Sequence, residues 1–288
     1  MGLSARIPWW FKMGAKLGLS RLPVPYGLWK RIGMFRHGEM MLPENAIRAF
    51  ESHFADAVDR IKLPKDFSVL ELGPGDSVLS GFVAIARGAG RAWLVDAGPF
   101  AEFDVETCRR TIGQVDASGK TLERLTADSA EALMAEANVV YLTEGTASMK
   151  EIPDASVDYF WSQVVLEHIY REEFPQLMAE LRRVAKPGAI GIHSIDYRDH
   201  LGGGLNNLRL PGRIWEAENF RDSGFYTNRI RPREMLEMIE NAGFAIELIA
   251  EDRWPEMPLP RDKMAAEFRD LPDEDFMVRE IRIAMKPV

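Results

Sequence analysis

The densest group of side chains that could do chemistry lies in residues 196–200, directly before three consecutive glycines. Asp196, Asp199 and His200 follow an apolar run, 190–193, that has the composition of a buried strand. A carboxylate that holds one nitrogen of an imidazole prepares the other nitrogen to accept a proton. These residues could therefore form a general base in which Asp196 or Asp199 orients His200. Alternatively, the two carboxylates could hold a divalent cation, or the segment could be a polar surface turn.

A second histidine, His168, follows Glu167 after another apolar run, 157–161. It could contact backbone groups at the start of a helix, or it could take part in the chemistry as a second candidate base. His193 still lies inside an apolar run, so we expect it to matter less than His200.

Residues 69–77, with the sequence VLELGPGDS, form an apolar run that ends in a glycine turn. Missing β-carbons let the backbone approach a nucleotide cofactor at the carboxyl end of a first strand. Asp96 ends the next run, where a carboxylate can accept both hydroxyls of a ribose. A nicotinamide site would need a third glycine at position 78, which is Val78, so the sequence disfavours a dehydrogenase.

The strands and helices that must position these residues are predicted from the order of apolar runs and helical segments along the chain. Short apolar runs alternate with helical or loop segments from residue 66 onward, which indicates parallel strands with crossover helices on both faces of an α/β sheet. A last run, 276–285, follows a connection without a clear helix pattern, so it predicts an antiparallel strand. The other predicted strands are 68–72, 92–95, 139–142, 157–161, 190–193 and 245–249.

Two segments stand apart from this alternation. Residues 1–65 are helical, basic, aromatic and interrupted by prolines, and they predict an N-terminal arm or lid with a helix near 44–59. Residues 197–231 form an insertion after the fifth predicted strand, rich in aromatic and amide side chains. This composition suits a carbohydrate-like acceptor, and it also suits a packed lid.

The net charge of −8 is unevenly distributed. Residues 1–38 contain seven basic and no acidic residues, so the remainder carries a net charge of −15, which disfavours nucleic acid as a partner. Within the arm, cations alternate with apolar residues, as in helices that lie in a membrane interface. The alternative is that these apolar residues pack on the body as a lid or a dimer contact. They are Trp9, Trp10, Phe11, Met13, Leu17 and Leu19.

The longest stretch without a charge, 77–86, is far too short to span a bilayer. The lone cysteine, Cys108, excludes an intrachain disulfide. The first residues lack the pattern of a secretory signal, so we expect a cytoplasmic protein, with the inner face of the membrane left open as its place.

Four motifs, in order, resemble those of the class I S-adenosylmethionine-dependent methyltransferases. They are ELGPG at 71–75, Asp96, the stretch IPDASVD at 152–158, and LRRVAKPG at 181–188. The resemblance spans residues 66–288 and implies a doubly wound, seven-stranded, mostly parallel sheet with an antiparallel last strand. It also implies S-adenosylmethionine as cofactor, with contacts to the methionine and ribose, the adenine, and the sulfonium. The residues implied, in that order, are Glu71, Gly73, Pro74, Gly75 and Asp96, then Ala97, Thr146 and Ala147, and finally Gln163 and Val164.

Three stretches together also resemble methyltransferases encoded beside bacterial glycan-assembly genes: the loop of Asp196, Asp199 and His200, the segment from Trp215 to Arg231, and FRHGEM at 35–40. That resemblance implies O-methylation of a sugar hydroxyl on a glycan or glycolipid. The alternatives are N-methylation of a small amine and a non-catalytic, cofactor-binding partner subunit. One branch of the family binds a metal through an acid three residues before the Glu-His pair, but Val164 stands at that position, so no metal is expected.

Overall fold

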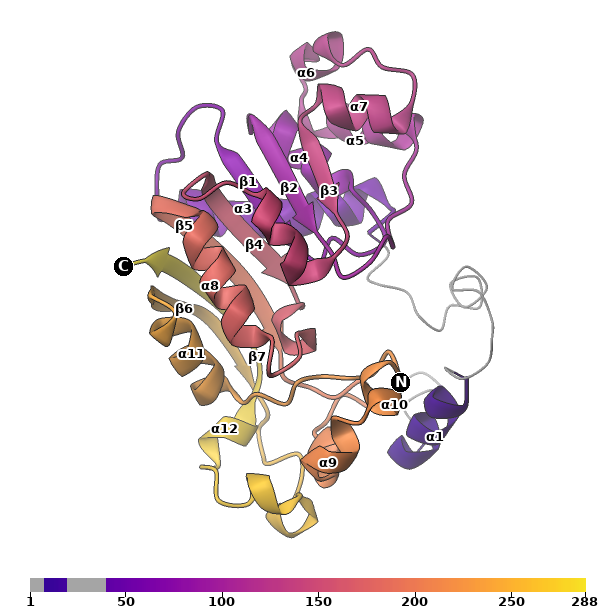
Figure 1. Cartoon of the computed structure of the whole chain (residues 1–288), viewed down its shortest axis with the longest axis vertical. Helices are drawn as coiled ribbons and strands as arrows, with labels where there is room; N and C mark the ends of the chain where they lie inside the picture. The colour runs from indigo at the N-terminus through magenta and orange to yellow at the C-terminus, as the bar shows by residue number, and fades with distance from the viewer. Residues whose placement is uncertain (1–7, 20–39) are drawn as a thin grey trace.

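A computed structural model describes residues 8–19 and 40–288 (Figure 1). A seven-stranded sheet in the order β3-β2-β1-β4-β5-β7-β6 forms its centre. Strands β1 to β5 pair in parallel, whereas β7 runs antiparallel to both of its neighbours, β5 and β6. The predicted fold class is confirmed. The strands are β1 (Ser68–Leu72), β2 (Arg91–Val95), β3 (Val139–Leu142), β4 (Val157–Gln163), β5 (Ala185–Asp196), β6 (Phe244–Arg253) and β7 (Val278–Pro287).

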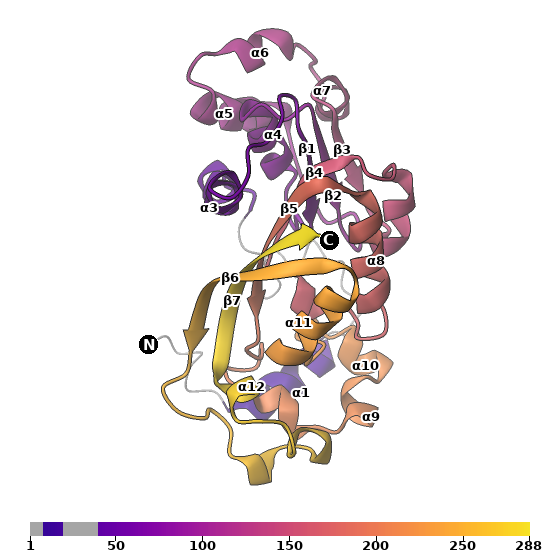
Figure 2. The ribbon, with the colours of Figure 1, turned by 90° about the vertical axis from the view of Figure 1, so that its left-hand side faces the viewer.

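Helices cover the sheet on both faces (Figure 2). On one face, α3 (Pro43–Val58), α4 (Leu79–Ala86), α5 (Val105–Val115) and α7 (Ala130–Glu136) share an apolar cluster with the sheet. On the other face, η2 (Gly145–Glu151), α8 (Phe174–Val184) and α11 (Pro232–Asn241) share a second cluster. Both faces of the central strands are thus buried, which explains why their sequences are continuously apolar.

Helix α3 shows how the local sequence fixes its place. Pro43 occupies the first turn, where its missing N–H costs no helical hydrogen bond. Phe50 packs against the rings of Tyr159 and Trp161 on β4, and Ala46, His53 and Ala57 are buried on the same stripe. The helix predicted near 44–59 is therefore packed on one face of the sheet, as part of the hydrophobic core.

The remaining elements cluster beside the carboxyl end of β5. After β5 come η4 (Asn206–Arg209), α9 (Gly212–Trp215) and α10 (Glu218–Arg221), and between β6 and β7 come η5 (Arg261–Lys263), η6 (Ala266–Phe268) and α12 (Glu274–Met277). Leu205 and Leu208 of the first insertion pack on Met264, Phe268 and Phe276 of the second. Only the first of these two insertions is predicted from the sequence.

Three short elements complete the described chain: α1 (Trp9–Leu19), α6 (Lys120–Arg124) and η3 (Leu166–His168). Helix α1 packs beside the first insertion (Figure 1). Among the described residues, no helix is both long and apolar enough to cross a membrane. The predicted arm residues 1–7 and 20–39 lie outside the described part.

Candidate functional site

The glycine turn after β1 adopts a conformation that favours glycine. Gly73 and Gly75 have φ angles of +65° and +69°, which residues with a β-carbon rarely adopt. A β-carbon on Gly73 would also lie only 2.6 Å from a methyl group of Val165, just after β4. The turn is therefore held close to the segment that follows β4, with Pro74 at its tip.

Asp96, directly after β2, is joined to this turn by a hydrogen bond. Its Oδ2 accepts a hydrogen bond from the Gly75 N–H at 3.0 Å, and its Oδ1 accepts one from the Ala97 N–H at 2.7 Å. The Asp96 carbonyl also accepts from the Gly145 N–H at 2.8 Å, after β3. The loops that follow β1, β2 and β3 thus meet at Asp96, through its carboxylate and its backbone carbonyl, and this position fits a ribose-binding role.

Glu71 lies behind the turn, inside the sheet, with only 3% of its surface exposed. The Ser80 hydroxyl in the first turn of α4 donates a hydrogen bond to its carboxyl group. Burial raises the pKa of Glu71 to about 8, so this group holds a proton at neutral pH. In the structure, its carboxyl group ties the end of β1 to the first turn of α4.

The other predicted cofactor residues also lie at the carboxyl edge of the sheet. Ala97 and Ala147 are exposed, and Thr146, Gln163 and Val164 are half-buried. Val164 has a φ of +50°, and its N–H donates to the Ser194 carbonyl at 2.9 Å, which ties the ends of β4 and β5 together. These placements are compatible with cofactor contacts, which stay predictions.

The two candidate bases meet each other. The Nε2 atoms of His168, in η3 after β4, and His200, in the loop after β5, are 3.2 Å apart. His168 Nδ1 lies 2.9 Å from the Tyr226 carbonyl, which can only accept a hydrogen bond. This contact assigns the proton of His168 to Nδ1, so its Nε2 accepts the hydrogen bond that His200 Nε2–H donates.

The expectation that Asp196 or Asp199 orients His200 is wrong. The Asp196 carboxylate pairs with the Arg198 guanidinium, at 2.8 Å to Nε and 2.7 Å to Nη2. Asp199 is 3% exposed, and its carboxylate accepts the backbone N–H groups of Leu201, Gly203 and Asn206. The short side chain of an aspartate readily accepts hydrogen bonds from backbone N–H groups of the residues that follow it. Asp199 therefore stabilises the closed loop that carries His200.

Asn228, in the first insertion, holds η3 in place through hydrogen bonds that the sequence pattern does not predict. The Asn228 side-chain amide donates to the carbonyls of Leu166 and Ile169 at 2.8 and 2.9 Å, and its N–H donates to the Glu167 carbonyl at 2.7 Å. Together with the Tyr226 carbonyl, Asn228 fixes His168 from the insertion. The aromatic and amide-rich composition of this insertion is the available signal, and it suits a packed lid as well as a carbohydrate-like acceptor.

Burial also separates the remaining described histidines from the candidate bases. His193 lies in β5, with Nδ1 2.8 Å from the Ser162 hydroxyl, and burial lowers its pKa to about 3. His53 lies against the Ser194 hydroxyl at 3.1 Å, and burial lowers its pKa to about 4. Both stay neutral at physiological pH and belong to the core.

Comparison with known proteins bears on the region that carries this site. Residues 94–192 match the family described as a methyltransferase domain. A protein of Mycolicibacterium smegmatis, named as a probable S-adenosylmethionine-dependent methyltransferase, is 28% identical over 108 residues, which are 38% of this chain. The match spans about a third of that relative, 36% of its length.

Two solved structures show similarity to the fold at low sequence identity. The YcgJ protein of Bacillus subtilis gives a TM-score of 0.45 at 16% identity, over 83% of this chain and 99% of that one. Phosphoethanolamine N-methyltransferase 2 of Haemonchus contortus, in complex with S-adenosylmethionine, gives 0.45 at 16% identity, over 84% of this chain and 53% of that one. Residues 94–192 of this chain are thus similar to a methyltransferase domain, and the relative in Mycolicibacterium is named as one that depends on S-adenosylmethionine.

Proposed function

We propose that the protein transfers a methyl group from S-adenosylmethionine to a hydroxyl oxygen of a sugar, on a glycan or a glycolipid. The observation that carries this proposal is the His168–His200 pair at the carboxyl edge of the sheet, where open α/β sheets bind their ligands. The residues present fit the cofactor, because Gly73 and Gly75 form a tight turn with positive φ angles after β1, and Asp96 offers carboxylate oxygens beside it.

The cofactor supplies a methyl group on a positively charged sulfur. A sugar hydroxyl is a weak nucleophile at neutral pH, so its oxygen needs to lose a proton as it attacks. With the hydrogen-bond directions assigned above, His200 carries its proton on Nε2 and a lone pair on Nδ1. We infer that Nδ1 takes the hydroxyl proton while the new O–CH₃ bond forms and the S–CH₃ bond breaks.

His168 stabilises the charge that this transfer creates. When His200 becomes an imidazolium, its Nε2–H still donates to His168 Nε2, and this charge-assisted hydrogen bond is stronger than the neutral one. His168 in turn is fixed through Nδ1 by the Tyr226 carbonyl. In this arrangement His200 is the catalytic residue and His168 is its positioning residue.

A polar hollow of about 360 Å³ lies beside Asn228, and its composition suits a sugar, although neither His168 nor His200 is among its lining residues. Carboxylates and guanidinium groups line it beside one aromatic ring, a combination that suits hydroxyl groups and the apolar face of a pyranose. Asn228, which holds η3, also lines this hollow. The charged and aromatic residues are Arg171, Glu216, Arg229, Glu234, Glu267 and Phe268.

Transfer of tritiated methyl groups from S-adenosylmethionine to a panel of sugars, lipid-linked glycans and small amines tests this proposal. We expect label only in hydroxyl acceptors, and wild-type turnover to require His200. Labelling of an amine that persists in His200→Ala would replace the proposal with N-methylation. Calorimetric binding of the cofactor without transfer to any acceptor would indicate a non-catalytic subunit.

A further inference from the structure

Helix α1 is amphipathic, and one of its faces packs on the body. Trp9, Met13 and Leu17 pack on the cluster formed by Leu201, Trp215, Phe225 and Tyr226. The Arg209 guanidinium also lies 5.4 Å from the centre of the Trp9 ring, a cation–π contact. The helix is therefore fixed to the insertion through residues spaced four apart.

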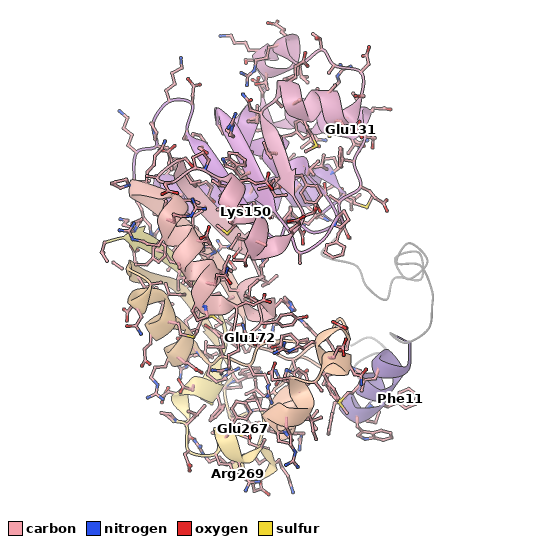
Figure 3. The ribbon with its side chains drawn as sticks, in the orientation of Figure 1. Phe11, Glu131, Lys150, Glu172, Glu267 and Arg269 are labelled. Atoms are coloured by element: carbon pink, nitrogen blue, oxygen red, sulfur yellow. The ribbon has the colours of Figure 1, made fainter. Side chains whose placement is uncertain are left out.

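The outer face of α1 exposes two large aromatic side chains. Trp10 is 58% exposed and Phe11 is 54% exposed, and their rings make an edge contact at 6.2 Å. Phe11 projects from the side of α1 that faces away from the body (Figure 3). Gly14 and Gly18 are exposed on the same helix, and a β-carbon added at either position would meet no atom of residues 8–19 or 40–288 within 4 Å. Within this described part of the chain, nothing covers this apolar face.

The charge of the N-terminal segment in the sequence indicates which kind of surface this face of α1 would bind. Residues 1–38 carry seven basic and no acidic side chains, whereas the remainder of the chain has a net charge of −15. An anionic lipid surface attracts the first segment and repels the rest, so it would orient the molecule with α1 toward the lipid. Aromatic rings beside cations are the composition that partitions into the headgroup layer.

We propose that α1 docks the protein on an anionic membrane surface, with Trp10 and Phe11 inserted among the lipid headgroups. The position of α1 gives this docking a use. The cluster beneath α1 contains Leu201, which follows His200, and Tyr226, whose carbonyl holds His168. Docking through α1 would bring the histidine pair close to the membrane, where a glycolipid acceptor is held. This use rests on the proposed function, whereas the docking itself does not.

Flotation of the full chain with vesicles tests the docking directly. Vesicles of phosphatidylglycerol and phosphatidylcholine are compared with vesicles of phosphatidylcholine alone, at low and high salt. The variant is W10S/F11S, which leaves the packed residues Trp9, Met13 and Leu17 in place. The matched control is V58S/L248S, because Val58 and Leu248 are 44% and 51% exposed on elements outside α1.

We expect salt-sensitive binding to the anionic vesicles, reduced at least about tenfold in W10S/F11S and unchanged in V58S/L248S, since two buried aromatic rings contribute more than this factor requires. Unchanged binding in W10S/F11S would overturn the proposal, and so would failure of the full chain to float on anionic vesicles. A dimer without vesicles that W10S/F11S dissociates would show that a second copy covers this face. Methyl transfer to a soluble sugar is expected to be the same in both variants, so failure of docking is distinguishable from failure of the proposed activity.

Discussion

His168 and His200 are 32 residues apart in the chain, yet their Nε2 atoms lie 3.2 Å apart and their rings are within 13° of parallel. Each ring is carried by a loop that leaves the carboxyl end of a parallel strand, β4 or β5. Neighbouring parallel strands bring such loops to one edge, and the Tyr226 carbonyl then sets the direction of the shared hydrogen bond.

Asp96 is expected to determine cofactor affinity. Asp96→Ala removes the acceptor of the Gly75 N–H and the proposed partner of the ribose hydroxyls. We expect a loss of about 2 kcal/mol in S-adenosylmethionine binding, since hydrogen bonds to charged groups contribute about 1.5–3 kcal/mol each. Isothermal titration calorimetry measures this loss, and the wild-type protein should show no binding of NAD. Unchanged affinity in Asp96→Ala would place the ribose elsewhere.

Asp199 is expected to act through the loop that carries His200. Asp199→Asn keeps the size of the side chain but replaces one of its two oxygens by an NH₂ group, which cannot accept the backbone N–H groups that bind there and meets them donor to donor. We expect kcat to fall at least about tenfold with cofactor affinity unchanged, because a displaced base loses its alignment. Asp196→Asn is the matched control, since Asp196 pairs with the half-buried Arg198. An equal fall in both variants would contradict the assignment.

Buried Glu71 makes the stability of the cofactor-free protein depend on pH. Its pKa is raised from 4.5 to about 8 in the folded state, so the folded protein binds this proton more tightly than the unfolded chain. The resulting stability is fully present below about pH 4.5 and is lost as the pH rises through 8. We expect the difference in unfolding free energy between wild type and Glu71→Gln to change by a few kcal/mol over this range. Urea unfolding from about pH 5 to about pH 8.5 measures it, and parallel curves would show that Glu71 is ionised when folded.

Removal of metal ions is expected to leave methyl transfer unchanged. The carboxylate oxygens of Asp196 and Asp199 are already engaged by Arg198 and by backbone N–H groups, so the loop that the sequence offered for a cation has its oxygen ligands in use. Activity after dialysis against EDTA, with and without added Mg²⁺, Mn²⁺ or Zn²⁺, checks this expectation. A loss that one of these ions restores would instead make the converging nitrogens of His168 and His200 its ligands.

The sequence predicts the place and order of the strands because each of them contains a short apolar run, although β5 and β6 extend beyond the predicted runs 190–193 and 245–249. The predicted last strand, 276–285, is within two residues of β7 (Val278–Pro287) at each end. The same reasoning identified His168 and His200 as candidates but not as partners, because their contact depends on how two loops fold. It also offers Asp199 as a residue that orients His200, whereas the Asp199 carboxylate accepts backbone N–H groups. An aspartate close to glycines in the sequence can bind either an imidazole or the backbone, and only the folded loop shows which of the two it binds.

The arm shows a second limit of sequence reasoning. The sequence allows two alternatives for the apolar residues of the arm, which can pack on the body or face a membrane. The structure divides these residues between two faces of α1, with Trp9, Met13 and Leu17 packed and Trp10 and Phe11 exposed. Helical periodicity allows both faces, but the pattern does not say which face meets the body.

The central claim is that His200 takes a proton from a hydroxyl acceptor during methyl transfer. The most direct measurement is NMR of the product formed with ¹³C-methyl-labelled S-adenosylmethionine and a sugar or glycolipid acceptor, by wild type and by His200→Ala. We predict a methyl group bound to oxygen, formed about 10²–10⁴ times more slowly by His200→Ala at unchanged cofactor affinity. His193→Gln, a change in the core, is the comparison for general damage. A methyl group bound to nitrogen, or an undiminished rate in His200→Ala, would contradict the claim.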